Sequence, residues 1–330
     1  MLKLSDFDYS LPKELIAQHP LTERDSARLL VLEHKTGLIA HRIFRDITEY
    51  LRPQDLLVLN DTKVLPARLY GRRVSGGKVE VLLLGRKTGL TFSALIKPAR
   101  LKLGERIIFN GQGISAELSS KNELSFSAQS IDQIYGLGTM PLPPYIKRKV
   151  EDSDAIYYQT VYAREDGSVA APTAGLHFSQ DLLAKIKARG LNIAYLTLHV
   201  GHATFKPVKA QDIRQHKMEK EYFQIPEETQ KLIKETRKQK GRIIAVGTTA
   251  CRTLETYAAG NKAGHTDLFI YPGYKFKLVD CLLTNFHLPR TTLFMLVCAF
   301  AGEKLIKKAY QEAIDNKYRF YSYGDAMLII

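Results

Sequence analysis

Five short segments of the chain combine small residues and threonine with side chains that transfer protons or form hydrogen bonds. They are Asn60–Lys63 (NDTK), Ala170–Phe178 (AAPTAGLHF), Leu198–Phe205 (LHVGHATF), Val246–Thr249 (VGTT) and Thr284–Thr292 (TNFHLPRTT). Glycine and alanine let a backbone approach a ligand closely, and a helix that follows such a turn offers free N–H groups. Histidine and aspartate are common proton-transfer groups in enzymes. The five segments therefore predict a site for a small polar ligand.

The same segments also admit a purely structural interpretation. The segments at 198–205 and 246–249 are compatible with tight strand–helix turns capped by threonine. The segment at 170–178 is compatible with a packed turn that contains a structural His177, and Asn285 with an Asx turn. His199 and His202 lie close together in sequence without a nearby third ligand, so we expect no metal site. The chain has no GxxxxGKS/T loop and no GxSxG elbow, which argues against a P-loop NTPase and an α/β-hydrolase.

The elements expected around these segments form two domains. Helical and strand patterns alternate in residues 1–66 and 153–330, which predicts one discontinuous α/β domain whose strands end at the five segments. Residues 67–152 contain six short alternating runs separated by turn residues, which predicts an inserted all-β domain, a small antiparallel barrel. The proline-rich stretch 140–149 is expected to be a stiff, exposed connector. The predicted fold class is an α/β sandwich with an inserted β-barrel.

Charge is unevenly distributed along the chain. The 48 Lys and Arg against 34 Asp and Glu give a net charge of +14. Residues 61–106 alone carry +8, whereas residues 1–60 carry −1. One face of the predicted barrel is therefore expected to be basic. A field of this sign favours a polyanionic partner, with nucleic acid ahead of a membrane surface.

Cysteine usage and apolar content point to the cytoplasm. The three cysteines are far apart and form no CxxC pair, which argues against a disulfide framework and fits a reducing compartment. The longest apolar run, residues 293–301, is shorter than the ~20 residues that span a bilayer. The first residues lack the apolar stretch of a signal peptide. We therefore expect a cytoplasmic protein without a membrane segment.

Six long phrases of this sequence resemble one family, the S-adenosylmethionine:tRNA ribosyltransferase-isomerases of queuosine biosynthesis. They are DLLVLNDTKVLPARLYG, YGLGTMPLPPYIKR, YQTVYAREDGSVAAPTAGLHFS, AVGTTACRTLE, FIYPGYKFKLVDCLLTNFHLPRTTLFMLVCAFAG and YRFYSYGDAM. The resemblance extends through nearly the whole chain. It departs from the family's pattern after His199-Val-Gly, where His202 and Ala203 precede Thr-Phe and narrow that loop.

The resemblance implies a tRNA-modifying transferase. Such an enzyme transfers the ribosyl part of S-adenosylmethionine to the aminomethyl group of a 7-deazaguanine at the wobble position of tRNA. Adenine and methionine leave, and the isomerised ribose gives epoxyqueuosine. S-adenosylmethionine is then a consumed substrate, so no cofactor is expected. The implied partners are tRNA and S-adenosylmethionine, and we expect a monomer. The family also implies an α/β domain with a β-barrel.

Residue roles follow from the matching phrases and from the needs of this chemistry. The candidate proton-transfer groups are His177, followed by His199 and Asp61. The candidate substrate-binding residues are Arg68, Thr173, Gly175, Gly201, Gly247, Thr248, Thr249, Asn285 and His287. A sulfonium favours acidic or aromatic neighbours, for which the candidates are Asp61, Asp325, Tyr271 and Tyr274.

Candidate tRNA contacts lie in the barrel and in the connector. The basic side chains among them are expected to contact phosphates, which gives affinity that depends on salt. An aromatic ring is expected to stack on an unpaired base. The set is Arg72, Arg73, Lys97, Arg100, Tyr145, Lys147 and Arg148.

Two other functions remain open from the sequence. A protein that only binds RNA would explain the charge but not the Gly/Thr/His segments. An α/β enzyme for small molecules with an incidental basic surface would explain those segments and would act on a free nucleobase without tRNA. Release of adenine in the presence or absence of tRNA distinguishes the three functions.

Overall fold

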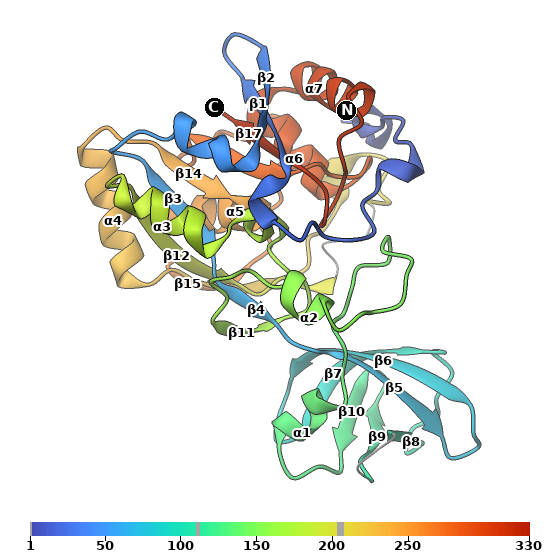
Figure 1. The fold of residues 1–330 in the computed structure, drawn as a ribbon. Helices are drawn as coiled ribbons and strands as arrows, with labels where there is room; N and C mark the ends of the chain where they lie inside the picture. Colours follow the sequence, from blue (N-terminus) through green and yellow to red (C-terminus); the bar gives the residue numbers. More distant parts are fainter. Residues whose placement is uncertain (1, 110–112, 203–207) are drawn as a thin grey trace.

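The computed structural model describes residues 2–109, 113–202 and 208–330 and divides them between a large α/β domain and a barrel (Figure 1). The α/β domain is built on nine strands, which are β1 (Arg28–Glu33), β2 (Leu38–Ile43), β3 (Leu56–Asn60), β12 (Asn192–Leu198), β13 (Glu221–Gln224), β14 (Ile243–Val246), β15 (Ala263–Thr266), β16 (Cys281–Asn285) and β17 (Ala326–Ile329). Their order in the sheet is β15-β13-β12-β3-β14-β16-β17-β1-β2.

Strand β3 lies inside this sheet and explains the continuous apolar run LLVLN. It pairs in parallel with β12 on one side and with β14 on the other, and all five of its residues are buried. Successive side chains of a strand point to opposite faces. Leu56 and Val58 accordingly belong to one hydrophobic cluster, and Leu57 and Leu59 belong to another. Both faces of the sheet therefore need a covering layer.

Helices supply that layer on each face. One cluster includes residues of α4 (Glu227–Lys238), α5 (Gly247–Ala258), α6 (Thr292–Ala301) and α7 (Glu303–Asp315). The other includes residues of the 3₁₀ helix η4 (Phe44–Tyr50) and of α3 (Gln180–Ala188). Ser179 caps α3, since its hydroxyl accepts a hydrogen bond from the N–H of Leu182 at 3.0 Å. The result is the expected three-layer α/β sandwich.

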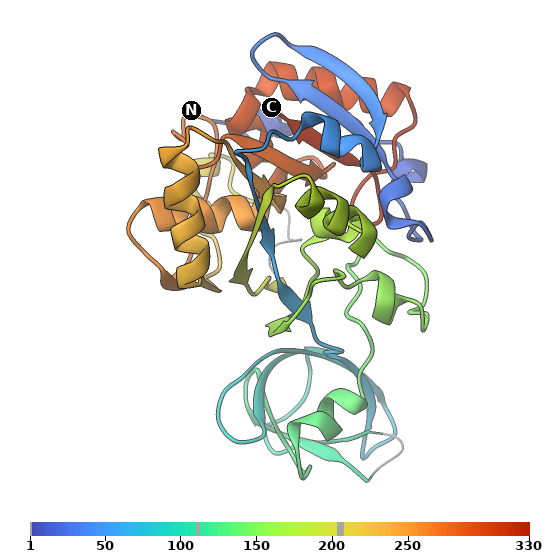
Figure 2. The same ribbon diagram turned by 60° about the vertical axis from the view of Figure 1, so that its left-hand side comes forward.

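The inserted domain is a closed antiparallel barrel, seen as a ring in Figure 2. Its strands are β5 (Arg68–Arg73), β6 (Lys78–Arg86), β7 (Thr91–Lys97), β8 (Arg106–Phe109), β9 (Ser115–Ser120) and β10 (Glu123–Phe126), and the short helix α1 (Ile131–Gly136) follows them. Alternate side chains fill the interior, among them Leu69, Val81 and Phe92. The predicted fold class, α/β with an inserted small barrel, is confirmed.

A narrow stem joins the two domains. Strand β4 (Thr62–Val64), which leads out of the large sheet, pairs in parallel with β11 (Glu165–Ser168). The returning chain passes through residues 140–149 and the short helix α2 (Asp154–Tyr157). The prediction of an exposed connector is wrong for residues 140–143 and for Ile146, which are buried. Met140, Leu142 and Ile146 are buried in one cluster with residues of the large domain, because apolar side chains between the prolines pack against it.

Candidate active site

Four of the five segments singled out in the sequence meet in one pocket, here called the strand-end pocket. Strands β12, β3, β14 and β16 run parallel to their neighbours in this order, so their carboxyl ends lie at one edge of the sheet. The pocket and the open space at its mouth together measure about 390 Å³. It is lined by Ala171, Pro172, Thr173, Ala174, Val200, Gly247, Thr248, Thr249, Thr284, Asn285, His287 and Leu293.

The beginning of α5 forms one wall of this pocket. Gly247, its first residue, has φ +88°, a left-handed conformation that favours glycine. The first N–H groups of a helix have no partner within the helix and favour anions or acceptor atoms. Asn60, from the fifth segment, supports this wall, because its Nδ2 donates to the Thr249 hydroxyl at 3.2 Å and to the Leu198 carbonyl at 3.0 Å.

Asn285 at the end of β16 connects the pocket to His177. Its Nδ2 lies 3.1 Å from the Tyr321 carbonyl, which can only accept, and 3.1 Å from Nε2 of His177. Nε2 therefore accepts, and the proton of the neutral imidazole lies on Nδ1. The Asn285 Oδ1 is buried and has no hydrogen-bond partner among the described residues. Because Asn285 lines the pocket, a ligand donor is the natural partner for this oxygen.

His177 is held neutral by its surroundings. Burial, with smaller contributions from the positive charges of Arg319 and Arg24, lowers its pKa to about 3. Phe44 stacks on its ring with the ring centroids 5.0 Å apart. The lone pair of Nε2 is already engaged by Asn285, so this imidazole is a hydrogen-bond donor through Nδ1 and a weak base.

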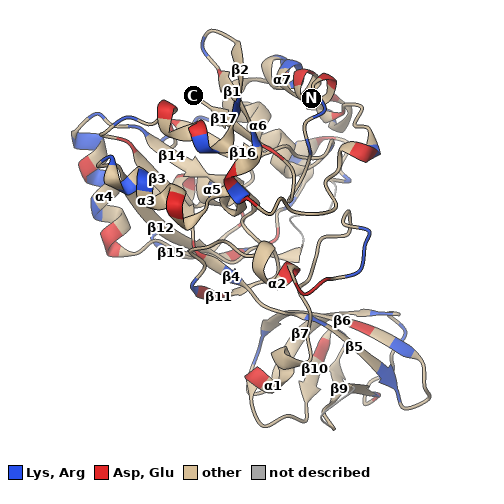
Figure 3. Cartoon of the chain, in the orientation of Figure 1, with Lys and Arg blue, Asp and Glu red and all other residues tan. Residues whose placement is uncertain are grey.

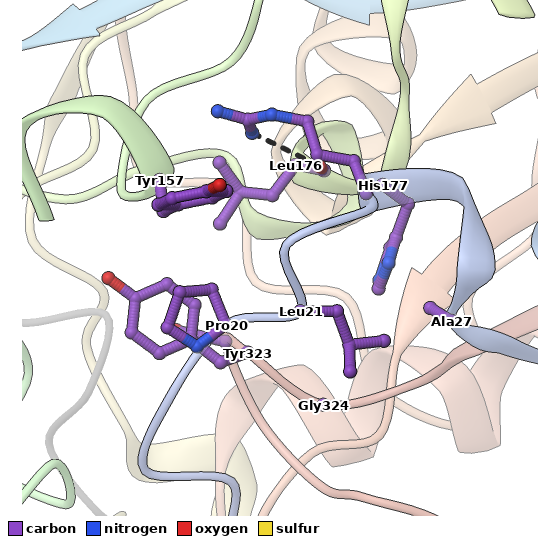
Figure 4. Close-up of a pocket in the computed structure, with 10 residues that line it drawn as sticks. Pro20, Leu21, Ala27, Tyr157, Leu176, His177, Tyr323 and Gly324 are labelled. Carbon is purple, nitrogen blue, oxygen red and sulfur yellow. Dashed lines mark hydrogen bonds between the residues drawn. The ribbon is translucent and has the colours of Figure 1, made fainter. Parts of the chain in front are cut away.

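A second pocket lies on the other side of His177 (Figure 4). It contains about 300 Å³ of empty space and is lined by Pro20, Leu21, Arg24, Ala27, Tyr157, Leu176, His177, Ser322, Tyr323 and Gly324. Arg24 donates to the carbonyls of Leu176 at 3.2 Å and Ile156 at 2.7 Å. The 3₁₀ turn η5 (Thr173–His177) separates the two pockets, since its first residues line the strand-end pocket and its last residues line this one.

His287 lies in the wall of the strand-end pocket, as predicted for a residue that contacts substrate. Its Nε2 is 2.7 Å from the Thr284 hydroxyl, and its backbone N–H donates to the Tyr310 hydroxyl at 3.0 Å. Burial lowers its pKa to about 3. A neutral His287 is therefore expected across the physiological pH range.

The structure does not bring the three candidate proton-transfer residues together. Asp61 is buried, accepts from Arg164 Nε and from the Thr197 hydroxyl at 2.7 Å each, and has a pKa raised by burial. His199 Nδ1 lies 2.9 Å from the Thr62 hydroxyl, and burial lowers its pKa. Neither is among the described residues that line the two pockets. The hydrogen bonds of Asp61 and His199 connect the ends of β3, β4 and β12, so both side chains stabilise the structure here.

Three other candidate substrate-binding residues, Gly175, Gly201 and Arg68, contact other parts of the protein and not the strand-end pocket. A Cβ on Gly175 would lie 2.0 Å from the Tyr162 hydroxyl, so this glycine makes room for a tyrosine and not for a ligand. The Gly201 N–H donates to Glu221 Oε1 at 2.8 Å. Arg68 forms an ion pair with Glu80 in the barrel and donates to the Leu142 carbonyl. None of the three is among the described residues that line the strand-end pocket.

The other residues that were predicted to contact the sulfonium, Asp325, Tyr274 and Tyr271, contact residues of the protein instead. The Asp325 carboxylate accepts from the backbone N–H groups of Arg28 at 2.9 Å and Arg319 at 2.7 Å. The Tyr274 hydroxyl donates to Glu255 at 3.1 Å. Tyr271 packs against Phe269 with ring centroids 5.0 Å apart. They lie outside the described lining of both pockets.

The candidate tRNA contacts divide into exposed and internal side chains. Arg72, Lys97, Arg100 and Lys147 are exposed. Arg73 lies 3.6 Å from Glu105.

The prediction that Arg148 and Tyr145 contact tRNA is corrected by the structure, in which both side chains contact other residues of the protein. Arg148 is 12% exposed and binds both oxygens of Asp154, at 2.6 and 2.7 Å. The Tyr145 ring lies 4.0 Å from that of Tyr321, and its hydroxyl is 2.5 Å from that of Ser322. Burial of the connector turns both side chains toward the protein.

Two findings concern metals and membranes. Among the residues that the structure describes, no group of three His, Cys, Asp or Glu side chains is placed to hold a metal ion. Within the same residues, no helix combines the length and apolar character that crossing a bilayer requires. The His202/Ala203 departure is described only in part, since Ala203 lies outside the described residues.

Some residues of these sites were missed in the sequence. Val200, Pro172 and Leu293 line the strand-end pocket, and Tyr70 and Lys78 line a groove on the barrel. Tyr70 and Lys78 alternate with the buried Leu69 and Val79, so the period of two in these strands was the signal that marks them as outward-facing. The apolar lining residues carry no comparable signal.

The fold and the strand-end pocket define a two-domain protein with an α/β domain, a pocket at the edge of its sheet and an inserted β-barrel that carries exposed cations. The family model described as "Queuosine biosynthesis protein" matches residues 4–329, so the chain belongs to that family and the sequence-based identification is confirmed. A protein of Sulfurihydrogenibium sp. named S-adenosylmethionine:tRNA ribosyltransferase-isomerase is 54% identical over 100% of both chains.

Two further relatives agree with this assignment. A protein of the same name from Thermosipho africanus is 54% identical over 99% of this chain and 100% of its own. The crystal structure of S-adenosylmethionine tRNA ribosyltransferase from Thermotoga maritima matches 98% of this chain and 100% of its own, with 41% identity and a TM-score of 0.58. The similarity therefore extends over both domains.

Proposed function

We propose that this protein transfers and isomerises the ribosyl part of S-adenosylmethionine onto tRNA, as the names of its relatives state for them. The proposed acceptor is the aminomethyl nitrogen of a 7-deazaguanine at the wobble position, and the product is epoxyqueuosine. One C–N bond forms to the acceptor, and the bonds from the ribose to adenine and to the methionine sulfur break. Within the ribosyl group the ring C–O bond opens while a C–C bond closes the cyclopentane and a C–O bond closes the epoxide. The acceptor amine loses a proton, and adenine leaves with one. The observation that supports this proposal is the strand-end pocket, which residues of three separate family phrases build together with Val200.

Asn285 and the start of α5 are the proposed ligand contacts in that pocket. The buried Asn285 Oδ1 accepts a donor of S-adenosylmethionine, such as a ribose hydroxyl or an amino group, which satisfies an oxygen that otherwise lacks a partner. The N–H groups of Gly247, Thr248 and Thr249 offer donors on the facing wall. In this proposal, the Asn285 amide and these backbone N–H groups bind the nucleoside part of S-adenosylmethionine directly, and no cofactor takes part.

The proposed role of His177 is that of a neutral donor that orients the site. A general base near neutral pH works best with a pKa close to that pH, whereas His177 has a pKa of about 3 and an engaged Nε2. We therefore assign proton abstraction to a group other than His177, in contrast to the sequence-based prediction.

Adenine release is the direct test of the activity. The purified protein, S-adenosylmethionine and tRNA carrying 7-aminomethyl-7-deazaguanine are incubated, and adenine is measured by chromatography. Release that requires the tRNA supports the proposal. Binding of tRNA without adenine release would show an RNA-binding protein only, and turnover on the free base would show a small-molecule enzyme. The tRNA substrate implies a cytoplasmic reaction, and we expect a monomer to perform it.

Single-turnover rates test the residue roles. Asn285→Ala removes the acceptor in the pocket and is expected to weaken S-adenosylmethionine binding. Asn122→Ala, the same change in an exposed barrel turn, is the control and should match the parent. His177→Ala should lower the rate by less than the roughly 10²–10⁴-fold that loss of a general base costs. A loss within that range would restore His177 as the base.

A further inference from the structure

The outer face of the barrel carries an exposed tyrosine among cations. Tyr70 on β5 is 55% exposed and lies directly opposite Glu80 on β6, which lies opposite Lys97 on β7. Arg72 lies opposite Lys78 in the same strand pair. Directly opposite residues of paired strands share one face of a sheet. These side chains therefore line one open groove, with Pro98 at its end and about 1040 Å³ of space above it.

The groove carries a net positive charge, and most of its cations form no ion pair within the described part of the chain. Its one acid, Glu80, forms an ion pair with Arg68. Within the described part of the chain, no acid lies within ion-pair distance of Arg72, Lys78 or Lys97, in contrast to Arg73 and Arg106, which contact Glu105 and Glu117. Figure 3 shows blue segments along β5 and at its turn into β6. An anionic partner is therefore favoured on this face.

Tyr70 narrows the chemistry of that partner. An exposed aromatic ring between cations is the combination that binds single-stranded nucleic acid, because the ring stacks on a base while the cations contact the flanking phosphates. In a duplex the faces of the bases are covered by their neighbours, so the ring has nothing to stack on. An acidic protein would use the cations but would gain little from the ring.

We propose that Tyr70 stacks on an unpaired base of a single-stranded RNA loop whose phosphates contact Arg72, Lys78 and Lys97. This inference rests on the proposed function and adds to it the kind of RNA segment that the barrel holds. The position fits the task, because Tyr70 is two residues along β5 from Arg68, which donates to the Leu142 carbonyl in the stem between the domains. An RNA loop in the groove thus begins beside the α/β domain.

The test compares two RNA probes and three variants of the full-length protein. The probes are an RNA stem-loop with an unpaired loop and a blunt duplex of the same stem, both at one fixed salt concentration. Tyr70→Ala should weaken stem-loop binding by about 5- to 150-fold, the equivalent of ~1–3 kcal/mol per stacked base, and should leave duplex binding unchanged. Tyr70→Phe, which keeps the ring, should bind both probes as the parent does.

Leu103→Ala is the matched control, since Leu103 is an exposed apolar side chain of the barrel outside the groove. It should bind both probes as the parent does. Stem-loop binding by Tyr70→Ala equal to that of the parent would overturn the proposal, as would an equal loss with the duplex. Binding needs no S-adenosylmethionine, so adenine release tests the proposed function separately. If the parent releases adenine but Tyr70→Ala binds the stem-loop as tightly as the parent does, the proposed stacking is rejected and the proposed function stands.

Discussion

At the scale of single residues, the site is defined by which hydrogen-bond partner each polar side chain has. Asn285 determines the tautomer of His177 because the Tyr321 carbonyl determines which way the amide points. Burial keeps both His177 and His287 neutral. His177 in the second pocket and His287 in the strand-end pocket are thus imidazoles that donate or accept hydrogen bonds without carrying charge.

The two buried histidines predict how stability depends on pH. Their pKa values of about 3 in the folded protein lie below the value of ~6.5 in an unfolded chain. The unfolded state therefore binds more protons below pH ~6.5, and stability is lost as the pH falls toward 3. At pH 5 the loss is about 2 kcal/mol for each histidine.

Urea unfolding at pH 7 and pH 5 measures this effect. The drop in unfolding free energy between the two pH values should be about 2 kcal/mol smaller in His177→Asn than in the parent, and His287→Asn should behave alike. An unchanged drop in both variants would show that these side chains do not titrate between the folded and unfolded states as expected.

Gly175 provides a steric prediction at the same scale. Gly175→Ala places a methyl group 2.0 Å from the Tyr162 hydroxyl, and overpacking of this kind costs about 1–3 kcal/mol. Gly136→Ala in α1 is the control, because a Cβ there meets no atom within 4 Å. Thermal unfolding should show a lower midpoint for the first variant only. Adding Tyr162→Phe should restore part of the loss, and no restoration would place the strain elsewhere.

At the scale of elements, a buried ion pair between Arg148 and Asp154 joins the connector to α2 in the stem between the domains. Burial raises the pKa of the Asp154 carboxyl, but hydrogen bonds from Arg148, the Glu151 N–H and the Tyr323 hydroxyl more than compensate and hold it below its usual value. Arg148 also donates to the carbonyls of Gln18 and Lys149. The basic run in the connector thus contains a structural arginine between two exposed lysines.

Removing this arginine should affect stability more than RNA binding. Arg148→Ala leaves Asp154 buried without its cation, which typically costs about 3–5 kcal/mol. The exposed Arg72→Ala should change the unfolding free energy by at most ~0.5 kcal/mol while weakening tRNA binding. Chemical unfolding and tRNA binding measured on both proteins separate the two effects. A stable Arg148→Ala with reduced tRNA affinity would return Arg148 to the phosphate-binding set.

At the scale of the whole molecule, charge and pocket lie in different domains. The strand-end pocket belongs to the α/β domain, and the exposed cations of the groove belong to the barrel, which Figures 1 and 3 show joined by the stem. The proposed contacts with S-adenosylmethionine and the proposed contacts with tRNA phosphates are therefore separable by mutation.

The salt dependence of tRNA binding tests that separation. Each phosphate contact contributes about 0.7–0.9 to the slope of log affinity against log salt. Arg72→Ala combined with Lys97→Ala should lower the slope by about 1.4–1.8 and leave S-adenosylmethionine binding unchanged. Arg106→Ala, an exposed barrel arginine that already contacts Glu117, is the control. An unchanged slope in the double variant would remove this face from the tRNA contacts.

The sequence by itself determined the family, the order of the elements, the inserted barrel and the concentration of charge in it. These features depend on local patterns, such as the alternation in β5 and β6, the apolar run of β3 and the Ser179 cap. Each pattern is formed by residues that are close together in the sequence and does not depend on distant ones. The segments that build the strand-end pocket were recognisable for the same reason, since each marks the end of its own strand.

Only the tertiary structure decided what the polar side chains do. Asp61 and Arg148 looked available in the sequence, yet each meets an opposite charge from another segment within 3 Å. Gly175 looked like space for a ligand and is space for Tyr162. His177 looked like a base until burial and Asn285 engaged it. The partners of Asp61 and His177 lie more than 100 residues away in the chain, and burial depends on the whole fold, so no local pattern encodes them; Asp154, six residues from Arg148, is the near exception.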